Sequence, residues 1–519
     1  MTEVNTVSPP VPSSAPPHRR SLPPQLAAAA VFFSSGAVLV LEIVGLRLVA
    51  PYLGITLQTN SAVIGIALAA IAYGAWSGGW LADRVDPRRV LAPIFLLAGA
   101  ATAVTLPTVR WAGEILRGSA SIGVLLLTAV AIFVPAALLS AITPLVVKLQ
   151  LADVDHTGRV VGKLSSIGTV GAITATLGTG FILVAAFPTS AILVGLAVLL
   201  AVAGLGLYFY LRRVDRAAVR LGERGRTAAA IALIGVTGAG LTGLTPNPCD
   251  VETGYHCARV VTDPDRPGGR LLLLNSARHS YVDLQNFRYL EFAYAKWMGA
   301  FADLHAPPGE PVRALHVGGG GLTLPRYLEA TRPGSFNRVL ELDGGLIELD
   351  KDRLGVTPGP NLEIEVGDAR TSLRRQPAGE FDLVIGDAFG HLAVPWHLTT
   401  VEFVTDIQRV LRPGGAYALN VIDYPPLRLI RAEVATVRAV FEEVALVSIT
   451  SALAGEQGAN FVILASDEPL PVEALRERLA TLSGLPATAI TGAELDAFVG
   501  DARVLTDDFA PVDQLLTRS

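Results

Sequence analysis

The sequence has few cysteines, no basic block and little charge. Its 519 residues include 41 Lys and Arg against 46 Asp and Glu, which leaves a net charge of −5. No Lys- or Arg-rich segment of the kind that nucleic-acid binding requires occurs, so nucleic acid is excluded as an expected partner. Cysteine occurs only as Cys249 and Cys257. With His256 as the one histidine beside them, these thiols cannot complete a tetrahedral zinc site, so no metal is expected.

Apolar residues are unevenly distributed along the chain. The first half is very apolar and the second has an ordinary soluble composition, so the mean hydropathy of +0.47 averages two unlike parts. A chain of this length also exceeds what one hydrophobic core normally holds. We therefore expect at least two domains, one of them in a membrane.

Seven apolar runs in the first half are long enough to span a bilayer as helices. Residues 1–24 precede them and are rich in Pro and Ser, which predicts a disordered cytoplasmic tail. A cleaved signal peptide is the less favoured alternative, because the run that follows is about 24 residues long. The sequence predicts a multi-pass α-helical domain over residues 25–246, with helices at about 26–50, 61–82, 90–108, 120–147, 166–187, 189–211 and 227–245.

Basic residues predict how these helices are oriented. They cluster in the tail and in alternate loops, near 84–89, 148–163 and 212–226. By the positive-inside rule the amino terminus is cytoplasmic, and an odd number of spans places the chain after 245 on the other side. We expect a multi-pass protein of the cell membrane with an extracytoplasmic C-terminal domain.

The cysteine pair provides a second indication of that orientation. Cys249 and Cys257 lie eight positions apart, directly after the last predicted span. An isolated close pair in an extracytoplasmic segment is most simply a disulfide, and two free thiols remain the alternative.

Two charged residues lie inside the first predicted span. Glu42 and Arg47 are five positions apart, about 140° round a helix, so they are not a same-face pair. Charge in a bilayer is costly. Arg47 is expected to snorkel to the interface, and Glu42 is the better candidate for a polar role.

The second half predicts two folded units. Residues 247–306 contain strand-like segments, which predict a small antiparallel β-rich subdomain, and then a linking helix at about 287–303. In residues 307–519 strands and helices alternate, which predicts an α/β domain of the methyltransferase-like Rossmann type that closes with a hairpin. The expected strands lie at about 312–317, 337–342, 362–366, 381–386, 415–422, 443–450 and 460–466, and the expected helices at about 322–331, 344–354, 398–411 and 427–441.

The first four of these strands end in glycine or a carboxylate. Gly318, Gly319 and Gly320 follow the first strand, where absent side chains let a ligand approach the backbone. Glu341 ends the second strand, where a carboxylate can accept both ribose hydroxyls. Because the carboxyl ends of parallel strands share one edge, the sequence predicts a nucleoside crevice there.

Three further acids complete the pattern. Asp368 ends the third strand, where it can accept from an adenine amino group, and Asp387 ends the fourth. Asp343, two residues after Glu341, is expected to cap the next helix instead.

At these residues the sequence resembles the spermidine synthase family, the polyamine aminopropyltransferases. The resemblance spans about 250–470, and LEIVGLRLVAPYLG near 41–54 is similar to the membrane-fused bacterial branch. In that family an amine displaces methylthioadenosine from decarboxylated S-adenosylmethionine. The resemblance implies a membrane-anchored aminopropyltransferase with that co-substrate and no required cofactor.

The resemblance also implies roles for single residues. Glu341 would bind the ribose, and Asp368 and Ala369 the adenine. Asp387 would position or deprotonate the attacking amine, and His256 stands in the substrate-binding set where the family has glutamine.

The chain departs from the family where acids hold a polyamine. Gly321 and Gly390 stand at positions that are aspartate in the family, and Tyr294-Ala295-Lys296 replaces Tyr-His-Glu. Each lost charge-assisted bond weakens binding by about 1.5–3 kcal/mol, so the nucleoside site is retained better than the polyamine site.

Two other functions stay open. One is a catalytically altered nucleoside- or polyamine-binding domain on a membrane module. The other is a transporter, because residues 79–89 resemble the loop between the second and third helices of major-facilitator proteins. The expected partners are an amine, a nucleoside and the lipid bilayer, with a homodimer as an open alternative.

Overall fold

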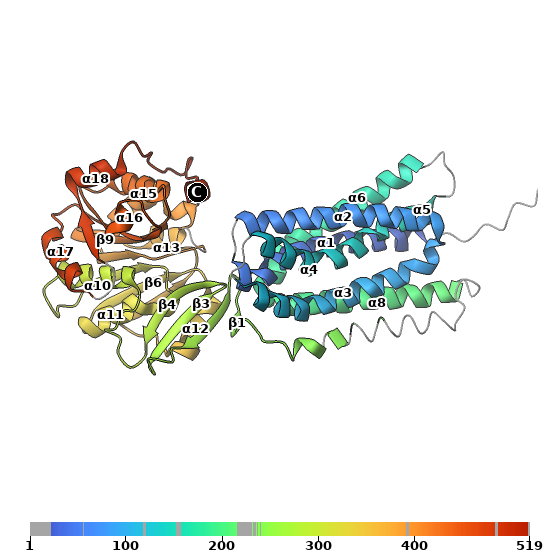
Figure 1. The fold of residues 1–519 in the computed structure, drawn as a ribbon, viewed down its shortest axis with the longest axis horizontal. Coiled ribbons are helices and arrows are strands. Elements are labelled where there is room, and N and C mark those ends of the chain that lie inside the picture. Colours follow the sequence, from blue (N-terminus) through green and yellow to red (C-terminus); the bar gives the residue numbers. More distant parts are fainter. Residues whose placement is uncertain are drawn as a thin grey trace, which may run out of the picture.

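Two unlike parts lie end to end in this chain, a bundle of long helices and an α/β part joined to it through a short strand (Figure 1). The computed structural model describes residues 22–516 except 55–56, 118–120, 152–156, 215–230, 232–234, 236, 239, 391–393 and 483–485.

The helical part follows the predicted apolar runs. Its elements are α1 (Pro24–Leu53), α2 (Leu57–Arg84), α3 (Pro87–Leu116), α4 (Ser121–Ser140), α5 (Ile142–Gln150), α6 (Thr157–Gly178), the π-helical η2 (Thr179–Leu183), α7 (Val184–Ala186) and α8 (Thr189–Val214). Six helical stretches within the described ranges are long and apolar enough to cross a membrane. They cover the first six predicted runs, whereas the seventh, at about 227–245, lies only in part within the described residues.

Small residues let these helices pack closely. A Cβ added at Gly74 of α2 would lie 2.2 Å from the carbonyl oxygen of Ala137, and one at Gly78 would lie 2.6 Å from the Cα of Ala141. The α2 backbone therefore approaches α4 and the junction between α4 and α5 at distances that only glycine permits.

A four-stranded antiparallel sheet joins the two parts. Its strands run in the order β1 (Val251–Glu252), β2 (Cys257–Thr262), β3 (Gly269–Leu274) and β4 (Ala277–Asp283). The helix that follows, α10 (Ala293–His305), starts later than the predicted 287. The predicted start was wrong because Asn286 accepts from the backbone N–H groups of Arg288 and Tyr289, through its side chain and its carbonyl oxygen, which closes a turn there instead.

The α/β part is built on an eight-stranded sheet in the order β12-β10-β11-β9-β8-β5-β6-β7. Strands β9, β8, β5, β6 and β7 are parallel neighbours, and β11, β10 and β12 add antiparallel pairs. The strands are β5 (Arg313–Val317), β6 (Phe336–Glu341), β7 (Leu362–Val366), β8 (Phe381–Gly386), β9 (Leu411–Asp423), β10 (Glu443–Ile449), β11 (Ala459–Ser466) and β12 (Ala487–Ile490).

Helices cover both faces of this sheet (Figure 1). They are α11 (Thr323–Thr331), α12 (Gly344–Leu354), α13 (Ala369–Arg375), α14 (Val401–Val410), α15 (Arg428–Arg438), α16 (Thr450–Leu453), α17 (Val472–Thr481), α18 (Gly492–Val499) and α19 (Val512–Leu515), with 3₁₀ turns η3 (Gly320–Leu322) and η4 (Trp396–Leu398). The predicted closing hairpin is formed by β10 and β11, and the short helix α16 lies in its connection. Strands β8, β5, β6 and β7 are parallel neighbours, so their carboxyl ends lie along one edge.

Candidate active site

The glycine turn after β5 lies against the end of β8. Gly318 has φ +96°, in the region that favours glycine, and a Cβ there would lie 2.5 Å from the carbonyl oxygen of Asp387. At Gly320 an added Cβ would lie 2.3 Å from His279 Nε2. Any side chain here would fill the space between β5, β8 and β4, so the turn presents bare backbone.

Glu341 fixes the same turn from the neighbouring strand. Its Oε2 accepts from the N–H of Gly319 at 2.7 Å, and its Oε1 accepts from the N–H of Asp343 at 2.8 Å. Burial raises the pKa of Glu341, although these two hydrogen bonds act in the opposite direction. Each oxygen retains a second lone-pair direction, which could accept from a hydroxyl group.

Asp343 caps the helix after Glu341, as its position predicts. Its Oδ1 accepts from the N–H groups of Gly345 and Leu346 at the start of α12. Its other oxygen faces the β1–β2 turn, where His256 Nδ1 lies 3.2 Å from Oδ2.

Asp368 follows β7 and caps α13. Its Oδ1 accepts from the N–H of Thr371 at 2.9 Å, and its Oδ2 lies 3.0 Å from His397 Nε2. Burial favours the neutral acid, but the hydrogen bonds from Thr371 and His397 outweigh it and lower the pKa of Asp368. Ala369 is the first residue of α13 and is buried.

Asp387 follows β8, and its carboxyl group is buried at the same edge of the sheet. Burial raises its pKa to about 6, while hydrogen bonds from Asn420 and Tyr294 act in the opposite direction. Asn420 Nδ2 donates to Oδ1 at 2.8 Å, and Asn460 Nδ2 donates in turn to Asn420 Oδ1 at 3.0 Å. A carboxyl group with this pKa is a competent base near neutral pH.

A pocket lies between Asp387 and the glycine turn. Besides those residues, it is lined by His279, Ser280, Tyr294 and His316. Burial lowers the pKa of each of these two imidazoles to about 4, with the charge of His256 as a second cause at His279. Both are therefore neutral at neutral pH, and Asp387 is the one carboxylate in the pocket lining within the described chain.

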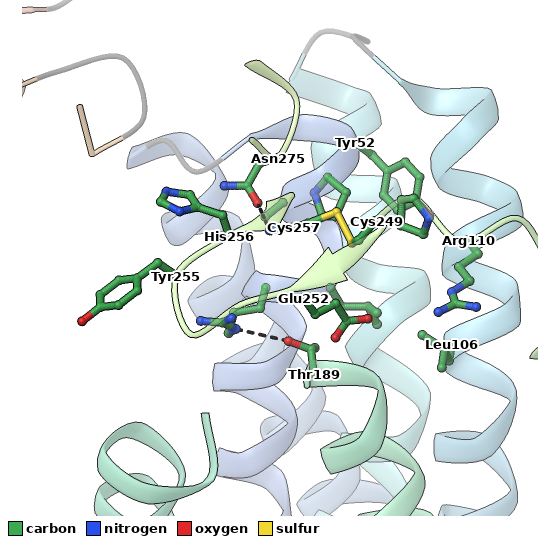
Figure 2. Close-up of a pocket in the computed structure, with 15 residues that line it drawn as sticks. Tyr52, Leu106, Arg110, Thr189, Cys249, Glu252, Tyr255, His256, Cys257 and Asn275 are labelled. Carbon is green, nitrogen blue, oxygen red and sulfur yellow. Dashed lines mark hydrogen bonds between the residues drawn. A yellow bond between two sulfur atoms is a disulfide. The ribbon is translucent and has the colours of Figure 1, made fainter. Parts of the chain in front are cut away.

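The structure brings some predicted site residues together and separates others. Gly318, Gly319, Gly320 and Asp387 line one pocket, and Glu341 reaches that pocket through Gly319. Asp368 and Ala369 lie at the end of β7, next to the strand that ends in Glu341. His256 lies outside that pocket. It contacts Asp343 and lines a second pocket, beside the disulfide at the end of the helical part (Figure 2).

Sequence reasoning missed the partners of the acids. Asn420 lies mid-strand in β9, and His397 lies in η4. Tyr294 was noted only as the tyrosine of an altered family motif. None of the three lies at a strand end, so only tertiary contact reveals them.

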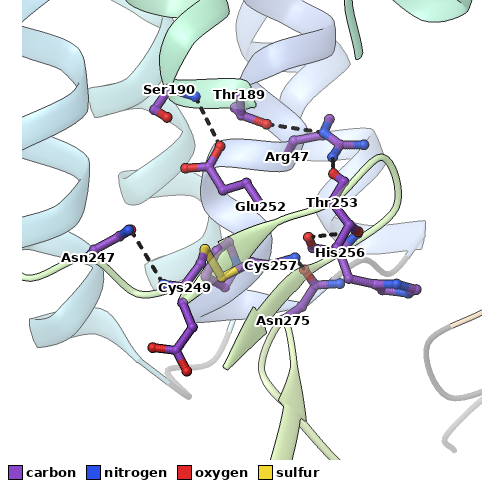
Figure 3. The surroundings of a disulfide bond; sticks show 12 residues. Arg47, Thr189, Ser190, Asn247, Cys249, Glu252, Thr253, His256, Cys257 and Asn275 are labelled. Atoms are coloured by element: carbon purple, nitrogen blue, oxygen red, sulfur yellow. Dashed lines mark hydrogen bonds between the residues drawn. A yellow bond between two sulfur atoms is a disulfide. The ribbon is translucent and has the colours of Figure 1, made fainter. Parts of the chain in front are cut away.

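Cys249 and Cys257 form a disulfide beside the helical part, with Cα atoms 5.1 Å apart (Figure 3). Within the described ranges, no cluster of three or more His, Cys, Asp or Glu side chains could hold a metal ion.

Comparison with known proteins bears on this site. The chain is 28% identical over 220 residues to the polyamine aminopropyltransferase of Vibrio vulnificus, covering 40% of this chain and 70% of that protein. Part of this chain is homologous to the spermidine synthase and polyamine aminopropyltransferase family. No family model matches the chain.

Other relatives carry the same family name. Spermidine synthase 1 of Hyoscyamus niger is 29% identical over 139 residues, 25% of this chain and 44% of that protein, so the match spans less than half of the plant relative. Among solved structures, a probable spermidine synthase from Corynebacterium glutamicum has a TM-score of 0.47 and 29% identity, over 50% of this chain and 97% of that one.

Proposed function

We propose that this chain is a membrane-anchored aminopropyltransferase that uses decarboxylated S-adenosylmethionine and an amine acceptor. The observation that carries the proposal is Asp387, a carboxyl group with a pKa of about 6 that faces the pocket beside the glycine turn. Homology to the spermidine synthase family supports the reaction class.

The proposed chemistry is one displacement at carbon. The amine nitrogen attacks the aminopropyl carbon bound to sulfur, and a C–N bond forms as the C–S bond breaks. The sulfur keeps the bonding pair and leaves as the neutral thioether of methylthioadenosine. The nitrogen must first lose a proton, and Asp387 accepts it or orients the amine.

The remaining predicted residues take the nucleoside. Gly318, Gly319 and Gly320 let it approach the backbone, and Glu341 accepts from its ribose hydroxyls with the lone pairs left free. Asp368 and Ala369 receive the adenine.

His256 supports nucleoside binding indirectly, because it contacts Asp343 and Asp343 contacts Glu341.

The helical part is proposed to be a membrane anchor. Its six described apolar helices support a bilayer-spanning domain within residues 25–246. The tail 1–24, the β-rich subdomain and linking helix 247–306, and the α/β domain 307–519 are the other proposed units. With a seventh span at 227–245, the soluble part would face away from the cytoplasm.

Turnover by the purified full-length chain tests the reaction. With decarboxylated S-adenosylmethionine and a panel of amines, we expect release of methylthioadenosine. Asp387→Asn should reduce it by about 10²- to 10⁴-fold, because an amide cannot accept the proton.

A binding module without catalysis is the second candidate. It is favoured by the presence of only one carboxylate in the described pocket lining, which gives two cationic substrates little neutralising charge. Tight binding of methylthioadenosine with no turnover across the amine panel would support it and would contradict the enzyme.

A further inference from the structure

The β1–β2 turn contacts the helical part and the candidate nucleoside site at the same time. On the helical side, Arg47 of α1 donates through Nη2 to the carbonyl oxygen of Thr253 at 2.7 Å and through Nη1 to that of Gly254 at 2.6 Å. Arg47 Nε also lies 3.2 Å from Thr189 Oγ1 at the start of α8. The Arg47 side chain therefore reaches from α1 to the backbone of this turn, which supplies its acceptors (Figure 3).

A second contact holds the turn to α8. Glu252 Oε2 accepts from the N–H of Ser190 at 3.1 Å. The Cys249–Cys257 disulfide closes the loop that contains Glu252, Thr253 and Gly254. The turn is thus held by α1, by α8 and by a covalent cross-link.

The other side of the turn reaches Asp343. Thr253 Oγ1 donates to Asp343 Oδ2 at 2.5 Å and accepts from the N–H of His256 at 2.8 Å. Although burial raises the pKa of Asp343, the hydrogen bonds from His256 and Thr253 outweigh it and lower that pKa, so the acceptor is a carboxylate at neutral pH.

Asp343 in turn holds Glu341. Its backbone N–H donates to Glu341 Oε1, and Glu341 Oε2 holds the N–H of Gly319 in the glycine turn. The contacts therefore form an unbroken series from Arg47 through Thr253, Asp343 and Glu341 to the glycine turn.

We infer that Arg47 and Thr253 are positioning residues for the nucleoside site, and that the helical part sets the orientation of Glu341 through the β1–β2 turn. This inference rests on the proposed function, because it assigns Glu341 to nucleoside binding. A carboxylate that must meet a ribose diol is sensitive to small displacements, so loosening this series weakens binding without removing a ligand contact.

The test measures binding of 5′-methylthioadenosine to the full-length chain in detergent by calorimetry. Arg47→Gln removes the donors to the two carbonyl groups, and Thr253→Val removes the bond to Asp343. Each should raise Kd by roughly three- to thirtyfold, the range expected for residues that act through a contact network. The double variant should be no weaker than the weaker single variant, because both changes interrupt the same series.

Two controls separate positioning from general loosening. Thr253→Ser keeps the hydroxyl group and should bind as the wild type does. Arg110→Gln alters another arginine, which lines the pocket beside the disulfide together with Arg47 (Figure 2). Arg110 donates to Thr242 and Asn247 rather than to the turn. Arg110→Gln should also leave Kd unchanged.

The outcomes distinguish the inference from the proposed function. If the wild-type chain does not bind methylthioadenosine, both fall. If it binds and Arg47→Gln binds equally well, or if the two single effects multiply in the double variant, only the inference falls. An equal loss in Arg110→Gln would likewise overturn it. If Arg47→Gln does not fold, the comparison of Thr253→Val with Thr253→Ser tests the inference. A higher Kd in Thr253→Val supports it, and equal Kd values contradict it.

Discussion

Asp387 lies in buried surroundings that favour its neutral form. Its pKa is raised to about 6, so the carboxylate form is lost as the pH falls through that value. When rates are expressed per concentration of protonated amine, the form from which Asp387 takes the proton, kcat/KM should fall about tenfold for each pH unit below the midpoint. A pH–rate profile of the full-length chain checks this. A midpoint near that of an ordinary aspartate would contradict the assignment.

The partners of Asp387 set that midpoint. Asn420 and Tyr294 donate hydrogen bonds that stabilise the carboxylate. We predict that Asn420→Leu and Tyr294→Phe each move the acid limb to higher pH, because the charged form loses a donor while burial remains. The same pH–rate profile measures the shift.

Tyr327→Phe is the matched control for the tyrosine, because this hydroxyl group donates to Asp303 and not to Asp387. Its midpoint should stay at the wild-type value. If the midpoint of the pH–rate profile in Tyr294→Phe equals that in Tyr327→Phe, the Tyr294 hydroxyl group does not lower the pKa of Asp387.

At the scale of elements, the glycine turn after β5 requires glycine at Gly318 for two separate reasons. Gly318 has a positive φ, and any Cβ there meets the Asp387 backbone. Gly355 at the end of α12 also has a positive φ, +64°, but an added Cβ meets nothing within 4 Å. Gly355→Ala should therefore lower the free energy of unfolding by about 1–2 kcal/mol through backbone strain alone.

Gly318→Ala should lower the free energy of unfolding more than Gly355→Ala does, because the glycine turn must also move away from β8. We predict a lower Tm than the control and loss of methylthioadenosine binding. Thermal unfolding and calorimetry in detergent measure both. Equal Tm values and intact binding in the two variants would contradict the close approach.

How much the sequence predicts also differs between elements. Strands β5 to β8 each end at or next to Gly or an acid, so their positions could be predicted within about two residues. The four-residue β12 has no such pattern, and it forms because its backbone pairs with β10. The short helices α13 and α18 were also missed, because their sequences carry no clear helical periodicity.

The site follows the same division. Glu341 and Asp387 could be predicted because strand ends converge in any parallel sheet. Asn420 and Tyr294 could not, because β9 and α10 come to Asp387 only through tertiary packing.

At the scale of the whole molecule, the two parts must lie on defined sides of a bilayer if the helical part spans it. Seven spans with a cytoplasmic amino terminus predict an extracytoplasmic carboxyl terminus. A periplasmic-type reporter fused after residue 519 should therefore be active, and a cytoplasmic-type reporter at the same position inactive. The reverse result would contradict both the span number and the expected compartment of the disulfide.

The Arg47 contacts bear on how this protein can be divided for study. A fragment that begins near residue 247 would keep every residue of the α/β sheet, yet the carbonyl groups of Thr253 and Gly254 would lose their charged donor. Water would replace it without fixing the turn in place. If the helical part sets the orientation of Glu341, such a fragment resembles the Arg47→Gln variant, and nucleoside affinities measured on it would differ from those of the intact chain.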